Sequence, residues 1–161
     1  MILTSLLAMI LPVVALAQTG NTPSAQDKNF VINALAAGLS EVQEGHLAAS
    51  KSYSAVKVIG KRMVADHDKA NDTLSSIAAA KGITPSAHVT SNEAAQLTHL
   101  QGLNGASFDS SYLKDQRLAH EKAIELFETE ARSGKDHDLK NFAAKTLLTL
   151  KMHLQMIKAA E

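Results

Sequence analysis

Apolar residues recur at spacings of three and four along four long stretches of this 161-residue chain. The stretches cover residues 27–50, 54–81, 109–132 and 136–160. Such spacings place side chains on one face of an α-helix, so each stretch predicts an amphipathic helix. Helices of this length bury their apolar faces against one another. The pattern therefore predicts an all-α fold, an antiparallel four-helix bundle.

Short polar residues and one longer connection separate the predicted helices. Ser54, Asp109 and Asp136 are the expected N-caps of the second, third and fourth helices, because their side chains can accept hydrogen bonds from free N–H groups. Residues 83–107 connect the second helix to the third. A structureless connection of that length is unusual in a compact domain, so we expect a short helix within it, over residues 91–103.

The first seventeen residues have the pattern of an export signal. They read MILTSLLAMILPVVALA, without a charged side chain, and end in the small-x-small sequence Ala15-Leu16-Ala17. We expect a signal peptide over 1–17 with cleavage after Ala17, a flexible leader over 18–26 and the bundle domain over 27–161. The mature protein would be periplasmic or secreted, without strong membrane binding. The signal lacks Lys and Arg, so an uncleaved anchor and a start set a few residues too late are the alternatives.

Composition excludes several classes of protein. Cysteine is absent, which excludes a disulfide framework, a zinc ribbon, an iron–sulfur centre and a thiol nucleophile. Lys and Arg total 16 and Asp and Glu total 16, so no net charge attracts the chain to nucleic acid. Aromatic residues make up only 4% of the chain, too few for base stacking. We expect no nucleic-acid partner; a homo-oligomer and a protein partner remain open.

Each predicted helix carries a metal-ligand type of side chain where its apolar stripe should continue. Glu41 and Glu44 interrupt the first stripe, His67 the second, His120 the third and His153 the fourth. A buried charge costs several kcal/mol unless it is paired or coordinated. Four such interruptions favour one shared explanation. The sequence therefore predicts a core metal site for a divalent transition metal, Zn²⁺, Fe²⁺, Mn²⁺ or Cu²⁺.

The alternative is a polar cluster that fixes the register of the helices without binding a metal. In that case Glu41 pairs with a charged His67, and His120 donates to an oxygen atom. The protein would then be a non-catalytic structural or stress-related bundle. Metal-dependent stability separates the two hypotheses, because only a true site stabilises the fold on binding.

The predicted levels of these residues along the bundle differ. Glu41 and His67 lie 12 and 14 residues from the first predicted turn, so their positions along the bundle axis differ by about 3 Å. His120 and His153 lie 14 and 19 residues from the last predicted turn, so their positions along the bundle axis differ by about 7.5 Å. We therefore expect Glu41, His67 and His120 to meet. His153 should lie one layer away or reach the others through its rotamer.

Known catalytic motifs give little support for an enzyme. A di-iron or di-manganese carboxylate site needs Glu three residues before His on two helices, and no His in the chain has Glu at that position. No P-loop, dinucleotide fingerprint or serine-nucleophile motif is present. Asp66 and Asp68 flank His67, and at most one of them can orient it, because neighbours on a helix point in different directions. Whether the chain is an enzyme stays open.

Several blocks of sequence carry a family resemblance. They are EVQEGHLA at 41–48, MVADH at 63–67, FDSSYL at 108–113, QRLAH at 116–120 and LKMHL at 150–154. With them the chain resembles the exported bacterial family called domain of unknown function 4142, from about Asp27 to the C-terminus. The resemblance implies a ferritin-like four-helix bundle with an acid on the first helix and histidines at 67, 120 and 153. It implies no assigned activity.

Overall fold

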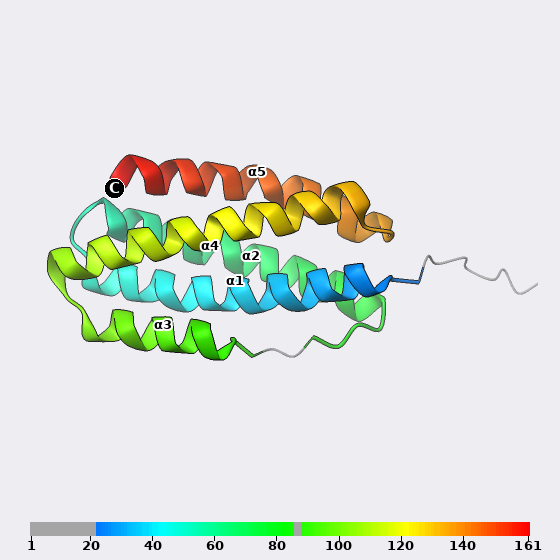
Figure 1. The fold of residues 1–161 in the computed structure, drawn as a ribbon, viewed down its shortest axis with the longest axis horizontal. Helices are drawn as coiled ribbons and strands as arrows, with labels where there is room; N and C mark the ends of the chain where they lie inside the picture. Colours follow the sequence, from blue (N-terminus) through cyan, green and yellow to red (C-terminus); the bar gives the residue numbers. More distant parts are fainter. Residues whose placement is uncertain (1–21, 86–87) are drawn as a thin grey trace, which may run out of the picture.

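The computed structural model describes residues 22–85 and 88–161, which form five α-helices and no strand. The helices are α1 (Ala25–Lys51), α2 (Ala55–Ala80), α3 (Ser91–Gly102), α4 (Gly105–Ser133) and α5 (His137–Ala160) (Figure 1). The predicted all-α class is confirmed. The predicted signal peptide and the first part of the leader lie outside the described residues. No described helix is both long and apolar enough to cross a membrane.

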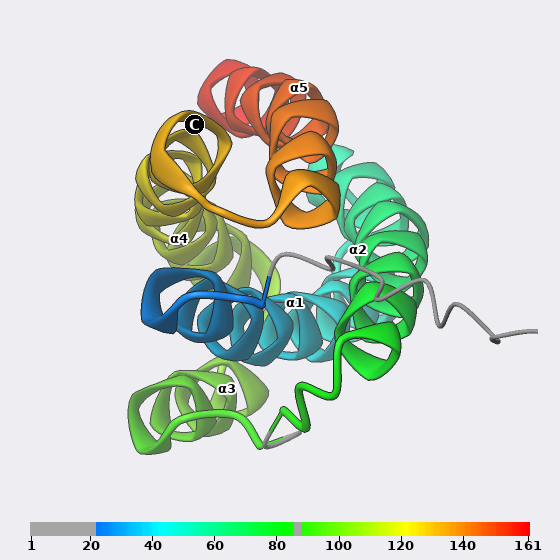
Figure 2. The ribbon, with the colours of Figure 1, turned by 90° about the vertical axis from the view of Figure 1, so that its right-hand side faces the viewer.

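The four long helices lie side by side along the long axis of the molecule (Figure 1). α1 packs along α2, and α4 packs along α5; α1 also contacts α4, and α2 contacts α5. Seen end-on, these four helices surround a common interior, and α3 lies outside them beside α1 (Figure 2). α3 occupies the stretch for which the sequence predicts a short helix.

Side-chain caps set the first residues of the helices. Ser24 and Asp27 form a reciprocal capping box at the start of α1. Ser54 accepts a hydrogen bond from the backbone N–H two residues later, and Asp136 accepts from two N–H groups in the first turn of α5. The predicted caps Ser54 and Asp136 are thus confirmed.

The prediction that Asp109 caps the third long helix is wrong. α4 begins earlier, at Gly105, after the N-cap residue Asn104, which makes no side-chain capping bond. Gly105 has a φ of 56°, which glycine adopts without steric penalty, so the chain turns there directly into the helix. Asp109 instead accepts a hydrogen bond from Ser54 Oγ at 2.7 Å, which links α4 to the start of α2.

The apolar core is divided into two clusters along the long axis. One cluster includes Phe30, Leu74, Phe127 and Phe142. The other includes Ala48, Met63, Tyr112 and Ile157. On every long helix, the residues between these two sets include the polar side chains predicted to bind metal. A polar layer therefore crosses the core, and all four long helices contribute to it.

α1 and α2 approach each other closely at Gly45 and Gly60. A Cβ atom added at Gly60 would lie 2.6 Å from Ala48 Cβ and 2.7 Å from the carbonyl oxygen of Gly45. Those distances are too short for any side chain, so the approach requires glycine. The contact sits next to the polar layer and holds α1 and α2 together there.

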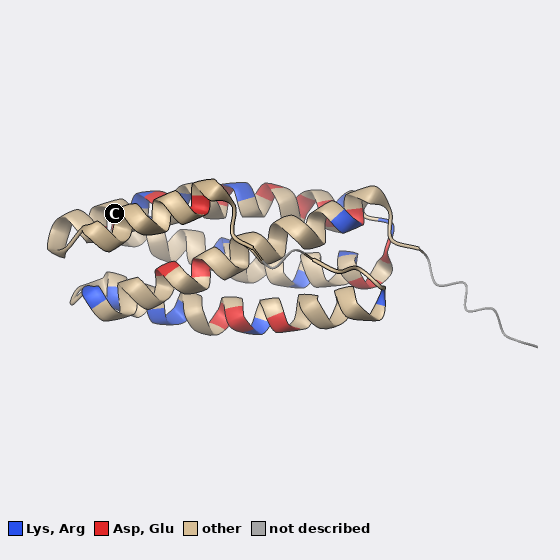
Figure 3. Ribbon diagram, turned by 90° about the horizontal axis from the view of Figure 1, so that it is seen from below, with Lys and Arg blue, Asp and Glu red and all other residues tan. Residues whose placement is uncertain are grey.

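Charged residues of both signs are interspersed along the helices (Figure 3). Some of them pair across helices: Lys81 Nζ lies 2.7 Å from Asp136 Oδ2 and 2.7 Å from Asp138 Oδ2, and Lys151 Nζ lies 2.8 Å from Glu128 Oε1. The pair of Lys151 and Glu128 is exposed, so water screens it and it adds little to stability. The pair of Lys81 and Asp136 differs, because Asp136 is buried at the start of α5.

Candidate metal centre

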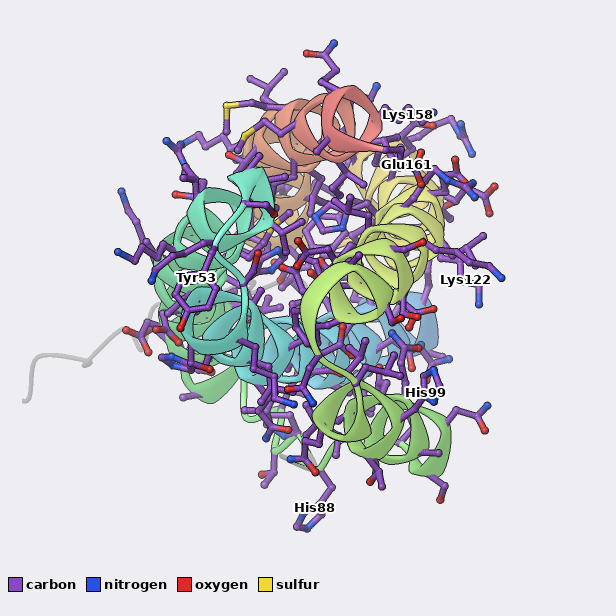
Figure 4. All side chains as sticks on the ribbon, turned by 90° about the vertical axis from the view of Figure 1, so that its left-hand side faces the viewer. Tyr53, His88, His99, Lys122, Lys158 and Glu161 are labelled. Carbon is purple, nitrogen blue, oxygen red and sulfur yellow. The ribbon has the colours of Figure 1, made fainter. Side chains whose placement is uncertain are left out.

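Three imidazole rings from three helices converge in the polar layer. His67 on α2, His120 on α4 and His153 on α5 each offer a ring nitrogen, and these nitrogens lie within 4.8 Å of one another. His120 and His153 are fully buried, and His67 is 8% exposed. Seen end-on, nitrogen and oxygen atoms gather between the long helices (Figure 4). The three histidines therefore occupy a common site inside the protein.

Hydrogen bonds determine which ring nitrogens of His120 and His153 carry protons. His120 Nδ1 lies 2.9 Å from the carbonyl oxygen of Gln116 and donates to it. His153 Nε2 lies 2.8 Å from Asp66 Oδ2 and donates to that carboxylate. A neutral imidazole has one N–H group, so the other nitrogen of each ring carries a lone pair.

The two remaining nitrogens, His120 Nε2 and His153 Nδ1, face each other at 3.3 Å. Two lone pairs at this distance repel each other unless a proton or a metal cation lies between them. Two nitrogen ligands bound at about 2.0–2.1 Å to one tetrahedral ion are roughly 3.3 Å apart. The observed spacing is therefore that of neighbouring ligands on a single ion.

Burial makes a shared proton unfavourable. Burial lowers the pKa of His120 to about 4, although the carbonyl oxygen of Gln116 acts in the opposite direction. Burial also lowers the pKa of His153, against the opposing effect of Asp66. Both rings are therefore neutral near pH 7, which leaves the two facing lone pairs without an added proton between them.

Glu41 on α1 adds a carboxylate to the layer. Its Oε1 lies 3.5 Å from His120 Nδ1, and its Oε2 lies 3.6 Å from His67 Nε2. Within the described part of the chain, neither Glu41 Oε2 nor His67 Nε2 has a hydrogen-bond partner. Buried polar atoms without a partner are rare. One cation could engage both.

The pKa values of Glu41 and His67 are shifted in opposite directions, and both shifts favour the neutral form. Burial, together with the charge of Glu93, raises the pKa of Glu41 to about 8. Burial, together with His120 and His153, lowers the pKa of His67 to about 3. A bound cation would reverse this balance for Glu41, because metal ligands are deprotonated carboxylates and neutral imidazoles.

His153 reaches the other rings, although counting from the predicted turn places it about 7.5 Å from His120 along the bundle. Counting from the observed helix ends reduces this difference. His120 lies 13 residues before the end of α4, and His153 lies 16 residues after the start of α5, a difference of about 4.5 Å. In addition, Cα–Cβ bonds tilt toward the N-terminus of a helix. In two helices of opposite direction, this tilt moves the two rings toward each other.

Glu44 takes a different place from the other four predicted ligands. Its carboxyl oxygens accept hydrogen bonds from Gln116 Nε2 at 2.8 Å, Gln96 Nε2 at 3.2 Å and Ser40 Oγ at 3.3 Å. Burial and the charge of Glu41 raise the pKa of Glu44 to about 7, while the bonds from Gln116 and Ser40 oppose the shift. The structure therefore brings together Glu41, His67, His120 and His153, and sets Glu44 among amides beside them.

Asp66 is a residue of the site whose partner the sequence does not reveal. Its position suggests that it orients His67, but its carboxylate reaches across to His153 on α5. It also accepts a hydrogen bond from Arg62 on its own helix. Although burial acts in the opposite direction, the bonds from Arg62 and His153 lower the pKa of Asp66. Asp66 is therefore ionised at neutral pH and holds the orientation of His153.

The fold and the site together define an all-α protein with a buried histidine–carboxylate cluster shared by four long helices. Residues 13–160 match the family described as domain of unknown function (DUF4142), and the chain belongs to that family. The family resemblance read from the sequence blocks is confirmed.

Comparison with solved structures supports the fold. A fragment of a DUF305 protein from Deinococcus radiodurans matches with a TM-score of 0.76 and 12% sequence identity, over 85% of this chain and 95% of that chain. At this identity the match shows a shared helical fold alone. No curated protein matches the chain.

Proposed function

We propose that this chain is an exported, ferritin-like four-helix bundle that binds one divalent transition metal ion through His67, His120, His153 and Glu41. The observation that carries the proposal is the 3.3 Å approach of two lone-pair nitrogens, His120 Nε2 and His153 Nδ1. Three imidazoles and a carboxylate form a donor set for Zn²⁺, and Fe²⁺, Mn²⁺ and Cu²⁺ accept the same ligands. Export is supported by the pattern of residues 1–17.

The number of buried ligands favours a structural or storage role over catalysis. Structural zinc sites have four protein ligands, whereas catalytic sites keep a position open for water or substrate. The three histidines would supply three ligands, and Glu41 would complete the set of four if its carboxylate turned from the Nδ1 side of His120 toward the ion. The absence of the Glu-x-x-His pattern argues in the same direction, because oxygen-activating di-metal sites in bundles require it.

A second candidate function is a structural or stress-related bundle whose polar layer fixes helix register. The bonds from His120 to the Gln116 carbonyl and from His153 to Asp66 favour it, since they satisfy part of the layer without a metal. This alternative leaves the facing lone pairs and the partnerless Glu41 Oε2 unexplained.

Thermal melts with added metals test the proposal. The mature protein is stripped with a chelator and melted with an excess of Zn²⁺, Mn²⁺, Cu²⁺ or, without oxygen, Fe²⁺. A metal at one hundred times its Kd stabilises the fold by about 2.7 kcal/mol. For a chain of this length that raises the Tm by about 5–10 °C.

Two alanine variants complete the test. His120→Ala abolishes the metal-dependent rise in Tm. His99→Ala is the matched control, because His99 is exposed on α3, and it keeps the rise (Figure 4). If no metal raises the Tm of the parent protein, the metal proposal is wrong and the register hypothesis is the remaining candidate.

A further inference from the structure

Two surface grooves reach residues that contact the three histidines, although no histidine lines either groove. One, of about 720 Å³, lies between α2 and α5 and is lined by Asp66, which is bonded to His153. The other, of about 400 Å³, lies between α1, α3 and α4 and is lined by Glu41, which contacts His67 and His120. A cation could approach the buried layer from either side, so the lining of each groove decides between them.

The charges that line the grooves differ in sign. The groove between α2 and α5 carries the cationic side chains of Arg62, Lys69 and Lys145 against two acids, Asp66 and Asp138. The groove between α1, α3 and α4 carries one cationic side chain, Lys122, which extends outward from α4 (Figure 4). Its acids are Glu41, Glu44, Glu93 and Asp115, and the raised pKa values of Glu41 and Glu44 leave most of the negative charge to Glu93 and Asp115. The first groove repels a divalent cation, and the second attracts it.

We infer that the groove between α1, α3 and α4 is the path by which a divalent cation reaches the three histidines. This inference rests on the proposed metal site. Glu93 and Asp115 are half-buried and form the outer part of the path, whereas Glu44 and Glu41 are buried and form its inner part. The cation passes from partly hydrated carboxylates to fully buried ones.

Buried oxygen atoms without partners line the inner part of this path. Gln116 is fully buried, and no hydrogen-bond partner for its Oε1 exists among residues 22–85 and 88–161; the same holds for Glu41 Oε2. Both residues line the groove. Two unsatisfied oxygen acceptors next to two carboxyl groups provide successive points of contact for a cation that sheds its water.

α3 takes part in the path through Glu44. Gln96 on α3 and Gln116 on α4 both donate hydrogen bonds to the Glu44 carboxyl group, and Ser40 donates a third. All three donors are neutral, so they position this carboxyl group without cancelling its negative charge when it is ionised. Removing the charges of Glu93 and Asp115 should therefore slow the entry of the cation, while Glu44 keeps its hydrogen bonds.

Stopped-flow mixing with Co²⁺ tests the path, because the visible absorbance of a bound Co²⁺ ion reports its arrival. The variant is Glu93→Gln/Asp115→Asn, which removes two charges outside the ligand set. Glutamine still closes the capping box at the start of α3, so the helix keeps its cap. We expect the association rate to fall about tenfold at low ionic strength, and the deficit to shrink as salt is added.

Two control variants separate an effect of the proposed groove from a general effect of charge and from entry through the other groove. Asp72→Asn/Glu125→Gln removes the same charge from exposed positions outside both grooves and should leave the rate unchanged. Lys69→Gln/Lys145→Gln removes positive charge from the other groove and should also leave it unchanged. An unchanged rate in Glu93→Gln/Asp115→Asn, or a faster rate in Lys69→Gln/Lys145→Gln, overturns the path.

The failure of the path and the failure of the metal site have different signatures. If the parent protein binds Co²⁺ but Glu93→Gln/Asp115→Asn binds it at the parent rate, only the path is wrong. If the parent protein gives no Co²⁺ absorbance and no metal-dependent rise in Tm, the metal site is wrong, and the path is wrong with it.

Discussion

His153 Nε2 donates a hydrogen bond to Asp66 Oδ2 over 2.8 Å, and this bond joins α5 to α2 at the polar layer. It holds the proton on Nε2, so His153 presents Nδ1 toward His120. A carboxylate in this position fixes the ring orientation and increases the basicity of the other nitrogen. Asp66 thus controls the orientation of a histidine that is 87 residues away in the sequence.

Asp66→Ala should lower metal affinity by about 10–100-fold, because His153 loses the partner that fixes its tautomer and orientation. Competition with a chelator of known affinity measures the change. Asp68→Ala is the control, since Asp68 is an exposed neighbour on the same helix. Equal affinity in both variants would show that Asp66 has no part in the site.

Glu41→Gln should separate the cost of burying a carboxyl group from its value as a ligand. Glutamine has nearly the same shape and no charge, so we expect the metal-free Tm to stay level or rise. The increase in Tm on adding metal should shrink, because an amide is a weaker ligand than a carboxylate. Melts of parent and variant with and without Zn²⁺ measure both effects. An undiminished metal-dependent increase would remove Glu41 from the ligand set.

Gly60→Ala should destabilise the protein by about 1–3 kcal/mol, because a methyl group there overlaps Ala48 and the backbone of Gly45. The gain in helix propensity, at most about 1 kcal/mol, offsets only part of this cost. Urea unfolding measures the difference. Gly102→Ala is the control, since nothing lies within 4 Å of the added Cβ atom. A stabilised Gly60→Ala variant would mean that α1 and α2 separate without penalty.

Glu130 and Asp27 connect the start of α1 to the turn between α4 and α5. Asp27 is fully buried and accepts hydrogen bonds from the backbone N–H groups of Lys135 and Asp136. Gln26 Nε2 donates to Glu130 Oε2 at 3.0 Å. Burial raises the pKa of Glu130 to about 7; the bond from Gln26 opposes this shift, and Asp27 reinforces it.

This raised pKa predicts the pH dependence of stability. The folded state holds the Glu130 proton more tightly than the unfolded state, whose pKa is near 4.5. The Glu130 contribution is therefore complete below pH 4.5 and is lost as the pH rises toward 7. Glu130→Gln removes this loss, so the stability of the variant should rise relative to the parent by at most about 3 kcal/mol between these limits, because solvent screening reduces the effect.

Urea unfolding at several pH values from 4.5 to 8 measures this gain for the metal-free protein. The comparison must be between variant and parent, because Glu41 and Glu44 also have raised pKa values and titrate in the same range. Glu125→Gln, an exposed position on the same helix, should follow the parent at every pH. A constant difference between Glu130→Gln and the parent would contradict the raised pKa.

Features that depend on near neighbours in the chain could be predicted from the sequence. Ser54 and Asp136 cap helices because a cap needs only the next two or three N–H groups. The polar layer could also be located, since helical spacing alone places Glu41, His67 and His153 on inward faces. The start of α4 could not, because Gly105 allows a turn that needs no side-chain cap.

Features that depend on how each helix is rotated about its axis relative to the others could not be predicted from the sequence. Glu41 and Glu44 differ by about 60° around α1, so the stripe pattern cannot tell which of them faces the histidines. The structure turns Glu41 to them and Glu44 to Gln96 and Gln116. For the same reason Asp66 could be matched with its sequence neighbour but not with His153 on another helix.

The four residues that meet in the polar layer are shared equally between two helical hairpins. The hairpin of α1 and α2 carries Glu41 and His67, and the hairpin of α4 and α5 carries His120 and His153. Each hairpin forms through contacts between residues close in sequence, whereas docking of the two needs distant ones, which form more slowly. Neither half alone holds more than two of these four residues. Tight capture of an ion would therefore mark the moment at which the two hairpins have joined, as the last step of folding.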